Sequence, residues 1–222
     1  MKILKITLGI LALFCITLTS CKKETKAPEN TSVKAEDLLG YQMVWFLTEP
    51  DGTQNLRLLY FDKEGDVVKA TLDGITSRII KTVKLDQNIF KLDLQENGSV
   101  VYTFEFGKKD GELMLISGKF YNINNPNYEA APGMLKRSDF IPVNGKAFRN
   151  AKINEIIIFN LDRWRHSSYP NLAGSFYECG TGGWKGVING QNYMGAYWDS
   201  GNGKIMLLQK AGDREITFFN PY

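Results

Sequence analysis

Residues 89–106, IFKLDLQENGSVVYTFEF, decide the fold class of this chain, because apolar side chains recur at every second position on both sides of a turn. The alternating apolar residues are Phe90, Leu92 and Leu94 before the turn, and Tyr102, Phe104 and Phe106 after it. Glu96-Asn97-Gly98 is typical of the turn itself. The stretch therefore predicts two antiparallel strands with one buried face and one solvated face.

The same pattern extends in both directions from this hairpin. Further strands are predicted at 41–47, 56–62, 67–72, 78–84, 113–117 and 119–123, and beyond residue 172 at 174–178, 184–188, 193–198, 204–209 and 215–219. Turn sequences rich in Gly, Asn and Asp separate these segments, as at Asn189-Gly190. Short strands spaced by about ten residues are typical of sandwiches and barrels rather than of βαβ units.

Two segments depart from this pattern. Residues 122–137 contain Pro126, Pro132 and Gly133, and predict a long loop that closes the first unit. Residues 146–159 have apolar side chains at roughly helical spacing but include the β-branched run 156–158, so helix and strand both remain open there.

We therefore predict an all-β protein of antiparallel meanders that form barrel or sandwich units, with at most one short helix, near residues 146–165. The predicted parts are a signal peptide at 1–20, a flexible tether at 21–36, a first β lobe at 37–141 and an aromatic-rich β lobe at 145–222. One continuous domain, built as a single larger barrel or sandwich, is the alternative to two lobes.

The amino terminus predicts export. Lys2 and Lys5 precede an apolar run at 6–18, which is shorter than the roughly 20 apolar residues of a membrane-spanning helix. Leu18-Thr19-Ser20-Cys21 resembles the lipobox of bacterial lipoproteins. This resemblance implies that Cys21 becomes the lipidated first residue of the mature chain and anchors it to a membrane. An ordinary soluble signal peptide cleaved at another small residue is the alternative.

The residues after Cys21 indicate which membrane holds the protein and predict a flexible segment next to the anchor. By the same resemblance, Lys22 in place of the Asp that retains many lipoproteins at the inner membrane favours the outer membrane, with the periplasmic or surface face left open. The polar, Pro-containing segment 22–36 lacks aromatic residues and is typical of a flexible tether.

The start of the last β segment has a second resemblance. Leu172-Ala173-Gly174-Ser175-Phe176 resembles the Gly-x-Trp opening of lipocalin-type barrels, with Phe176 where Trp is usual. The resemblance implies a barrel and a small apolar ligand. The 51 residues from Leu172 to Tyr222 are too few for the eight strands of such a barrel.

Charge and cysteine content exclude several classes of function. The net charge is +3, and removal of residues 1–20 takes away Lys2 and Lys5 and leaves +1, so no nucleic-acid partner is predicted. Lipidation of Cys21 leaves Cys179 without a disulfide partner, and we expect a buried, inert thiol.

Aromatic residues are dense near the carboxyl end. Eight lie within 35 residues: Trp164, Tyr169, Phe176, Tyr177, Trp184, Tyr193, Tyr197 and Trp198. Trp and Tyr rings stack on sugars and line apolar pockets, so Trp184, Tyr193, Tyr197 and Trp198 are the candidate ligand-binding residues. The alternative is that one set fills the core and the other covers the surface near the loops.

Enzyme and cofactor signatures are sparse. His166 is the one histidine, no C-x-x-C or phosphate-binding loop occurs, and neither a metal site, a cofactor nor a catalytic group is predicted. A Cys179–His166 pair is the single candidate for nucleophilic chemistry. The leading hypothesis is a non-enzymatic module for a hydrophobic or glycan ligand. The alternatives are an accessory or immunity-type interaction lipoprotein, with an envelope protein as its partner, and a Cys–His hydrolase.

Overall fold

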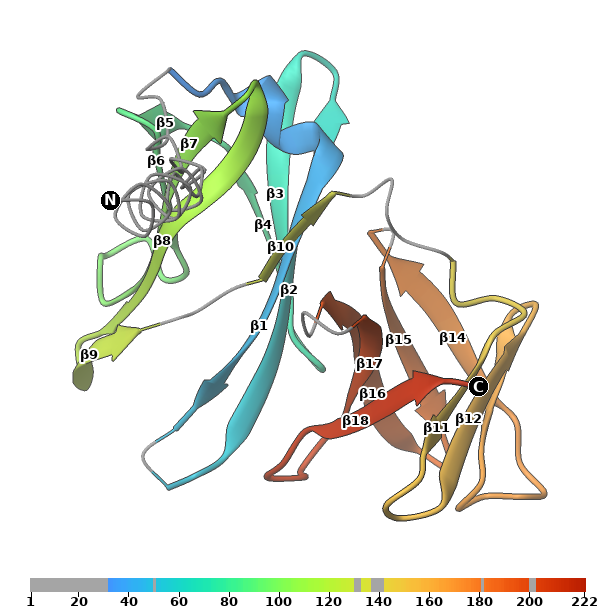
Figure 1. Ribbon diagram of the computed structural model, residues 1–222. Coiled ribbons are helices and arrows are strands. Elements are labelled where there is room, and N and C mark those ends of the chain that lie inside the picture. Colours follow the sequence, from blue (N-terminus) through green and yellow to red (C-terminus); the bar gives the residue numbers. More distant parts are fainter. Residues whose placement is uncertain (1–31, 50, 130–132, 137–141, 181, 200–202) are drawn as a thin grey trace, which may run out of the picture.

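The computed structural model is almost entirely β and consists of three antiparallel sheets (Figure 1), which confirms the predicted fold class. It describes residues 32–49, 51–129, 133–136, 142–180, 182–199 and 203–222. Cys21, the predicted signal peptide and most of the predicted tether lie outside these residues. Within them, the helical element is one short 3-10 helix, η1 (Ala35–Gly40).

Two five-stranded sheets form the first lobe. The first has the strand order β10-β1-β2-β3-β4, with β1 (Tyr41–Thr48), β2 (Gln54–Glu64), β3 (Val67–Asp73), β4 (Arg78–Thr82) and β10 (Gly133–Lys136). The second runs in sequence order through β5 (Leu85–Asp86), β6 (Ile89–Asp93), β7 (Val100–Lys109), β8 (Glu112–Asn122) and β9 (Asn125–Glu129).

The apolar face predicted from the alternation at 89–106 is buried in the core between these two sheets. Phe90, Tyr102 and Phe104 are buried, and the rings of Tyr102 and Phe104 pack edge-on against Trp45 of the facing sheet, with centroids 5.3 and 5.6 Å away. Leu38 of η1 is fully buried in the same core. Val33 is also buried, so the folded part already includes residues that we expected to belong to the tether.

Two local predictions in this lobe were wrong. The strands predicted at 113–117 and 119–123 are one strand, β8, because a bulge at Ile116 shifts the register without ending the pairing with β7. The loop predicted at 122–137 contains β9 and β10. These are short strands at sheet edges, where proline and glycine are tolerated because one side of the strand needs no partner.

The second lobe is a closed eight-stranded barrel in which each strand pairs with the next and the last pairs with the first. Its strands are β11 (Ala147–Asn150), β12 (Glu155–Asn160), β13 (Arg163–His166), β14 (Gly174–Cys179), β15 (Gly183–Ile188), β16 (Gln191–Asp199), β17 (Lys204–Lys210) and β18 (Thr217–Pro221). Segment 146–165 is therefore strand rather than helix. Ile157 is buried and Ile158 is exposed, as the period-two pattern of a strand requires.

The barrel interior is packed with aromatic side chains. Trp164 and Trp184 are fully buried, and their indole centroids are 4.9 Å apart. A Cβ on Gly174 would lie 2.5 Å from Nε1 of Trp164, and a Cβ on Gly195 would lie 2.2 Å from Nε1 of Trp184. Glycine at these two positions therefore lets each indole rest directly on the backbone of the barrel wall.

The barrel packs against the outer face of the first sheet. Leu58 of β2 lies in one apolar cluster with Met194 and Leu207 of the barrel, whereas its neighbour Leu59 faces the core of the first lobe. Gln209 joins the lobes with its side-chain oxygen, which accepts from the backbone N–H of Leu56 at 2.8 Å. The predicted boundary between the two lobes falls between β10 and β11.

Candidate functional site

Trp184 and Trp198, two of the predicted ligand-binding residues, lie in packed regions. The ring of Trp184 is fully buried and contacts Phe159, with centroids 4.8 Å apart. Trp198 lies at the junction of the lobes, where a Cβ on Gly133 of β10 would come within 3.0 Å of its indole nitrogen. These two residues therefore line neither of the cavities described below.

Tyr193 and Tyr197 lie at opposite ends of the barrel. Tyr193 pairs with Lys210 at the end of β17, and Tyr197 pairs with Met206 near the start of β17. Four residues along a strand correspond to about 13 Å. Each tyrosine lines a separate cavity, so the structure does not bring the four predicted residues into one site.

The cavity beside Tyr197 has a volume of about 420 Å³ and a mainly apolar lining, and we call it the apolar pocket. Its lining residues come from the two ends of the barrel sequence and from β16 and β17: Gly145, Lys146, Ala147, Phe148, Tyr197, Lys204, Pro221 and Tyr222. Phe148 and Tyr197 pack edge to face with centroids 5.6 Å apart. Burial, assisted by the charge of Glu178, raises the pKa of Tyr197 to about 12, so its hydroxyl stays neutral.

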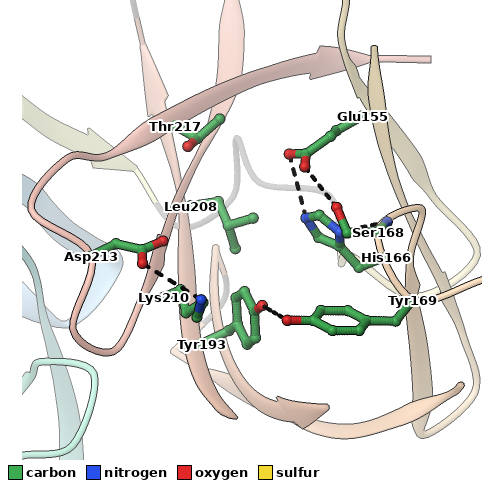
Figure 2. A pocket seen from close by; sticks show the side chains of 9 residues that line it. All are labelled: Glu155, His166, Ser168, Tyr169, Tyr193, Leu208, Lys210, Asp213 and Thr217. Carbon is green, nitrogen blue, oxygen red and sulfur yellow. Dashed lines mark hydrogen bonds and ion pairs between the residues drawn. The ribbon is translucent and has the colours of Figure 1, made fainter. Parts of the chain in front are cut away.

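The cavity beside Tyr193 is smaller, about 150 Å³, and strongly polar, and we call it the polar pocket (Figure 2). Its lining residues come from five strands and two loops: Glu155, His166, Ser168, Tyr169, Tyr193, Leu208, Lys210, Asp213 and Thr217. Of these, the sequence selected Tyr193 as a candidate for ligand binding and His166 as a candidate partner of Cys179.

Hydrogen bonds and ion pairs hold the walls of the polar pocket. The hydroxyl of Ser168 donates to Oε1 of Glu155 at 2.7 Å, and the backbone N–H of Ser168 donates to Nδ1 of His166 at 3.2 Å. Nε2 of His166 is 3.6 Å from Oε2 of Glu155. On the other walls, the hydroxyl of Tyr193 is 3.5 Å from that of Tyr169.

His166 and Cys179 do not form a catalytic pair. The register of β13 with β14 places Trp164 opposite Gly174, so Cys179 is seven residues further along β14 than the position opposite His166. Seven residues along a strand correspond to about 23 Å. In addition, His166 packs among the aromatic rings of the barrel end, whereas Cys179 belongs to the cluster between the lobes.

Cys179 is buried next to a charged group that joins the lobes. Its Sγ atom lies 3.6 Å from a guanidinium nitrogen of Arg78, which is paired with the fully buried Asp73. Burial, reinforced by the negative charge of Asp73, raises the pKa of the thiol to about 12. A thiol with this pKa holds almost no thiolate at neutral pH and is a poor nucleophile.

Apart from Tyr193 and His166, the residues of the polar pocket have no signature that can be recognised in the sequence. Glu155 and Lys210 are charged residues at strand ends, and Asp213 lies in the turn between β17 and β18, where charged residues are common on any protein surface. They meet because closure of the barrel brings β12 and β17 to the same rim.

In the described part of the chain, no cluster of His, Cys, Asp or Glu forms that is suited to a metal ion. That part also contains no helix long and apolar enough to span a membrane.

Comparisons with known proteins add little to this description. No protein-family model matches the chain, and no curated protein matches it. One similar solved structure is the glycoside hydrolase family 43 YxiA protein from Bacillus licheniformis, at 13% sequence identity and a TM-score of 0.24. The match covers 80% of this chain and 54% of that chain, so it spans about half of the neighbour's length. At this TM-score the similarity carries no argument about fold or activity.

Proposed function

We propose that this chain is a lipid-anchored protein of the bacterial cell envelope, with the outer membrane favoured, and that its barrel is a non-enzymatic binding module. Its ligand is a small molecule with an apolar body and an anionic group, bound in the apolar pocket. The observation that carries this proposal is the volume of that pocket, about 420 Å³. Pockets that hold small ligands usually measure about 300–1,000 Å³ and are mostly apolar with a few polar groups.

The chemistry of the apolar pocket favours an amphipathic anion. Phe148, Tyr197 and Pro221 supply flat apolar surface, and the ammonium groups of Lys146 and Lys204 are the charged side chains of the lining. An apolar body buried against the rings gains hydrophobic free energy, and an anionic group near the lysines gains electrostatic attraction. Among the side chains that the structure describes, none that lines this pocket is acidic and would oppose the anion.

The binding proposal is tested with laurate, and with dodecanol as the uncharged probe of equal chain length. The protein is the full chain carrying Cys21→Ser, and binding is followed by displacement of a fluorescent anilinonaphthalene sulfonate. We expect laurate to bind more tightly than dodecanol, and Lys146→Met with Lys204→Met to weaken laurate severalfold, because each exposed ion pair contributes up to about 1 kcal/mol. Lys152→Met, on an exposed turn of the same barrel, is the matched control and leaves binding unchanged.

Ala147→Trp provides the steric test, because Ala147 is a small residue of the pocket lining and an indole at this position adds bulk to the pocket wall. We expect this variant to lose both probes while it keeps the circular dichroism spectrum and the melting temperature of the parent. Undiminished laurate binding in Ala147→Trp, or no laurate binding to the parent chain, contradicts the proposal.

The lipid anchor is tested separately by metabolic labelling of cells with radioactive palmitate. We expect the expressed chain to incorporate label and to fractionate with the outer membrane, and Cys21→Ser to abolish labelling. Cys179→Ser is the control, because this buried thiol is not a site for acylation and the variant should remain labelled. Labelling that survives Cys21→Ser but not Cys179→Ser would refute the anchor.

A further inference from the structure

The polar pocket is a built cavity at the end of the barrel opposite the apolar pocket. Figure 2 shows Glu155, His166 and Ser168 grouped on one side of it, and Lys210 with Asp213 on the other. The rings of Tyr169 and Tyr193 form a third wall. These side chains come from strands distant in sequence, and hydrogen bonds fix several of them before any ligand arrives.

The His166 group presents a donor and an acceptor side by side. Because Nδ1 accepts the backbone N–H of Ser168, the neutral ring carries its proton on Nε2. Burial, with the charge of Lys210 acting in the same direction and that of Glu155 opposing, lowers the pKa of His166, so the ring is neutral at pH 7. His166 is only 6% exposed, and its Nε2 lies 3.6 Å from Oε2 of Glu155, beyond hydrogen-bond distance. A ligand hydroxyl is able to bridge this gap by accepting from Nε2 and donating to Glu155.

The opposite wall has the same mixed character. Nζ of Lys210 lies 3.6 Å from Oδ1 of Asp213, so an ammonium donor and a carboxylate acceptor again lie together. A purely anionic ligand would face the carboxylates of Glu155 and Asp213, and a purely cationic ligand would face Lys210. A neutral ligand with several hydroxyl groups satisfies both walls, because each hydroxyl donates and accepts.

Size and shape narrow the ligand class further. A volume of 150 Å³ corresponds to about five water molecules at the liquid density, and a cavity of about this size is able to hold one six-membered ring. Tyr169 and Tyr193 offer flat rings that pack against the C–H face of a sugar, with a hydroxyl group at the edge of each ring. We propose that the polar pocket binds one neutral hydroxyl-rich ring, either a free monosaccharide or the terminal sugar of a glycan.

His166 supplies a direct readout, because it is the one histidine of the chain and its ring protons give a single set of NMR signals. Untagged full chain is titrated with glucose, galactose, mannose and N-acetylglucosamine, and then with disaccharides that carry the best sugar at their end. We expect at least one sugar to shift the His166 signals saturably. Tighter binding of the disaccharide identifies a glycan end, and tighter binding of the free sugar identifies a monosaccharide.

Matched variants separate the pocket from the rest of the barrel. Glu155→Gln should weaken the best sugar about ten- to a hundredfold, because a hydrogen bond to a charged group is lost. Tyr193→Phe should weaken it less, because the ring remains. Glu178→Gln and Tyr177→Phe alter exposed residues of β14 that do not line the polar pocket, and both variants should bind normally. Saturable shifts caused by acetate or tetramethylammonium but by no sugar would overturn the proposal. Sugar binding unaffected by both pocket variants would also overturn it, and so would His166 signals in the parent chain that no sugar moves.

Discussion

Trp184 and Lys185 are neighbours on strand β15 and are both buried, yet they lie in regions that different forces hold together. Trp184 points into the barrel, where aromatic rings pack on one another and on glycine backbone. Within the described residues, its indole N–H has no hydrogen-bond partner, so this region is stabilised by packing rather than by polar contacts.

Lys185 points to the junction with the first lobe, where buried polar groups are paired. Its ammonium donates to Oδ1 of Asp73 at 2.9 Å and to the carbonyl of Ser77 at 2.9 Å. Asp73 also accepts two hydrogen bonds from Arg78. Burial alone therefore does not predict the effect of a substitution on stability. A substitution in the barrel interior removes packed volume, whereas a substitution at the junction removes the partner of a charged group.

The largest loss of stability is expected from Trp184→Ala, which removes a packed side chain from the barrel interior. Truncation of a buried tryptophan leaves a cavity among Phe159, Trp164 and their neighbours, and such changes lower the free energy of unfolding by about 3–5 kcal/mol. Urea unfolding followed by fluorescence measures the loss. Val187→Ala, on the same strand but partly exposed, is the control and should cost well below that.

Gly195→Ala sharpens the same test without removing any atoms. The new methyl group would lie 2.2 Å from Nε1 of Trp184, and overpacking of this kind costs about 1–3 kcal/mol. Trp184→Phe replaces the indole by a smaller ring. The double variant should therefore recover part of the stability that Gly195→Ala alone loses. Strictly additive effects of the two substitutions would show that the contact is not the cause.

At the junction, Asp73→Asn is expected to cost somewhat less than Trp184→Ala. The substitution leaves Lys185 buried without its counter-charge, and breaking a buried pair by removal of one partner costs about 3–5 kcal/mol. We expect about 3 kcal/mol, at the lower end of that range, because the Ser77 carbonyl still accepts from Lys185. The measurement is again the free energy of unfolding in urea.

Lys185→Met in the Asp73→Asn background tests the cause of that loss. An apolar side chain of similar length needs no counter-charge, so the double variant should be more stable than Asp73→Asn alone. A packing defect would instead worsen with the second substitution. The two regions are thus distinguished by the kind of second substitution that restores each: a smaller ring in the interior and an uncharged side chain at the junction.

The same distinction explains what could be predicted from the sequence. Period-two alternation around Phe90 and Phe104 reports burial on one face, and it correctly predicted the hairpin of β6 and β7. The first four residues of strand β15 are buried on both faces because the first lobe covers their outer side, and no local sequence pattern indicates that contact. Gly133 and Pro126 suggested a loop, because the pairing of short edge strands depends on neighbours distant in sequence.

The candidate pockets show the same limit. Tyr193 and Tyr197 were selected because aromatic rings bind ligands, and each lines a cavity, but their separation along β16 follows from strand geometry that composition does not encode. The polar pocket depends on the meeting of Glu155, His166 and Lys210 at one rim, which exists only after the barrel has closed. Residue types that suit a site can be recognised in a sequence, whereas their convergence is a property of the fold.

The smallest effect concerns acid sensitivity at the polar end of the interior. Burial lowers the pKa of His166 below its ordinary 6.5, so the folded state binds fewer protons than the unfolded state as the pH falls past that value. Stability should therefore be fully present above pH 6.5 and decline as the solution is acidified toward the folded-state pKa, with a slope below about 1.4 kcal/mol per pH unit. Urea unfolding between pH 7.5 and about 5.5 measures this slope, because this pH window lies above the ordinary pKa values of carboxyl groups.

His166→Gln removes the one histidine and should flatten the dependence of stability on pH. An equally steep decline in that variant would place the titrating group outside the barrel rim, and a rise in stability with acid would mean that the imidazolium is favoured by Glu155 despite its burial.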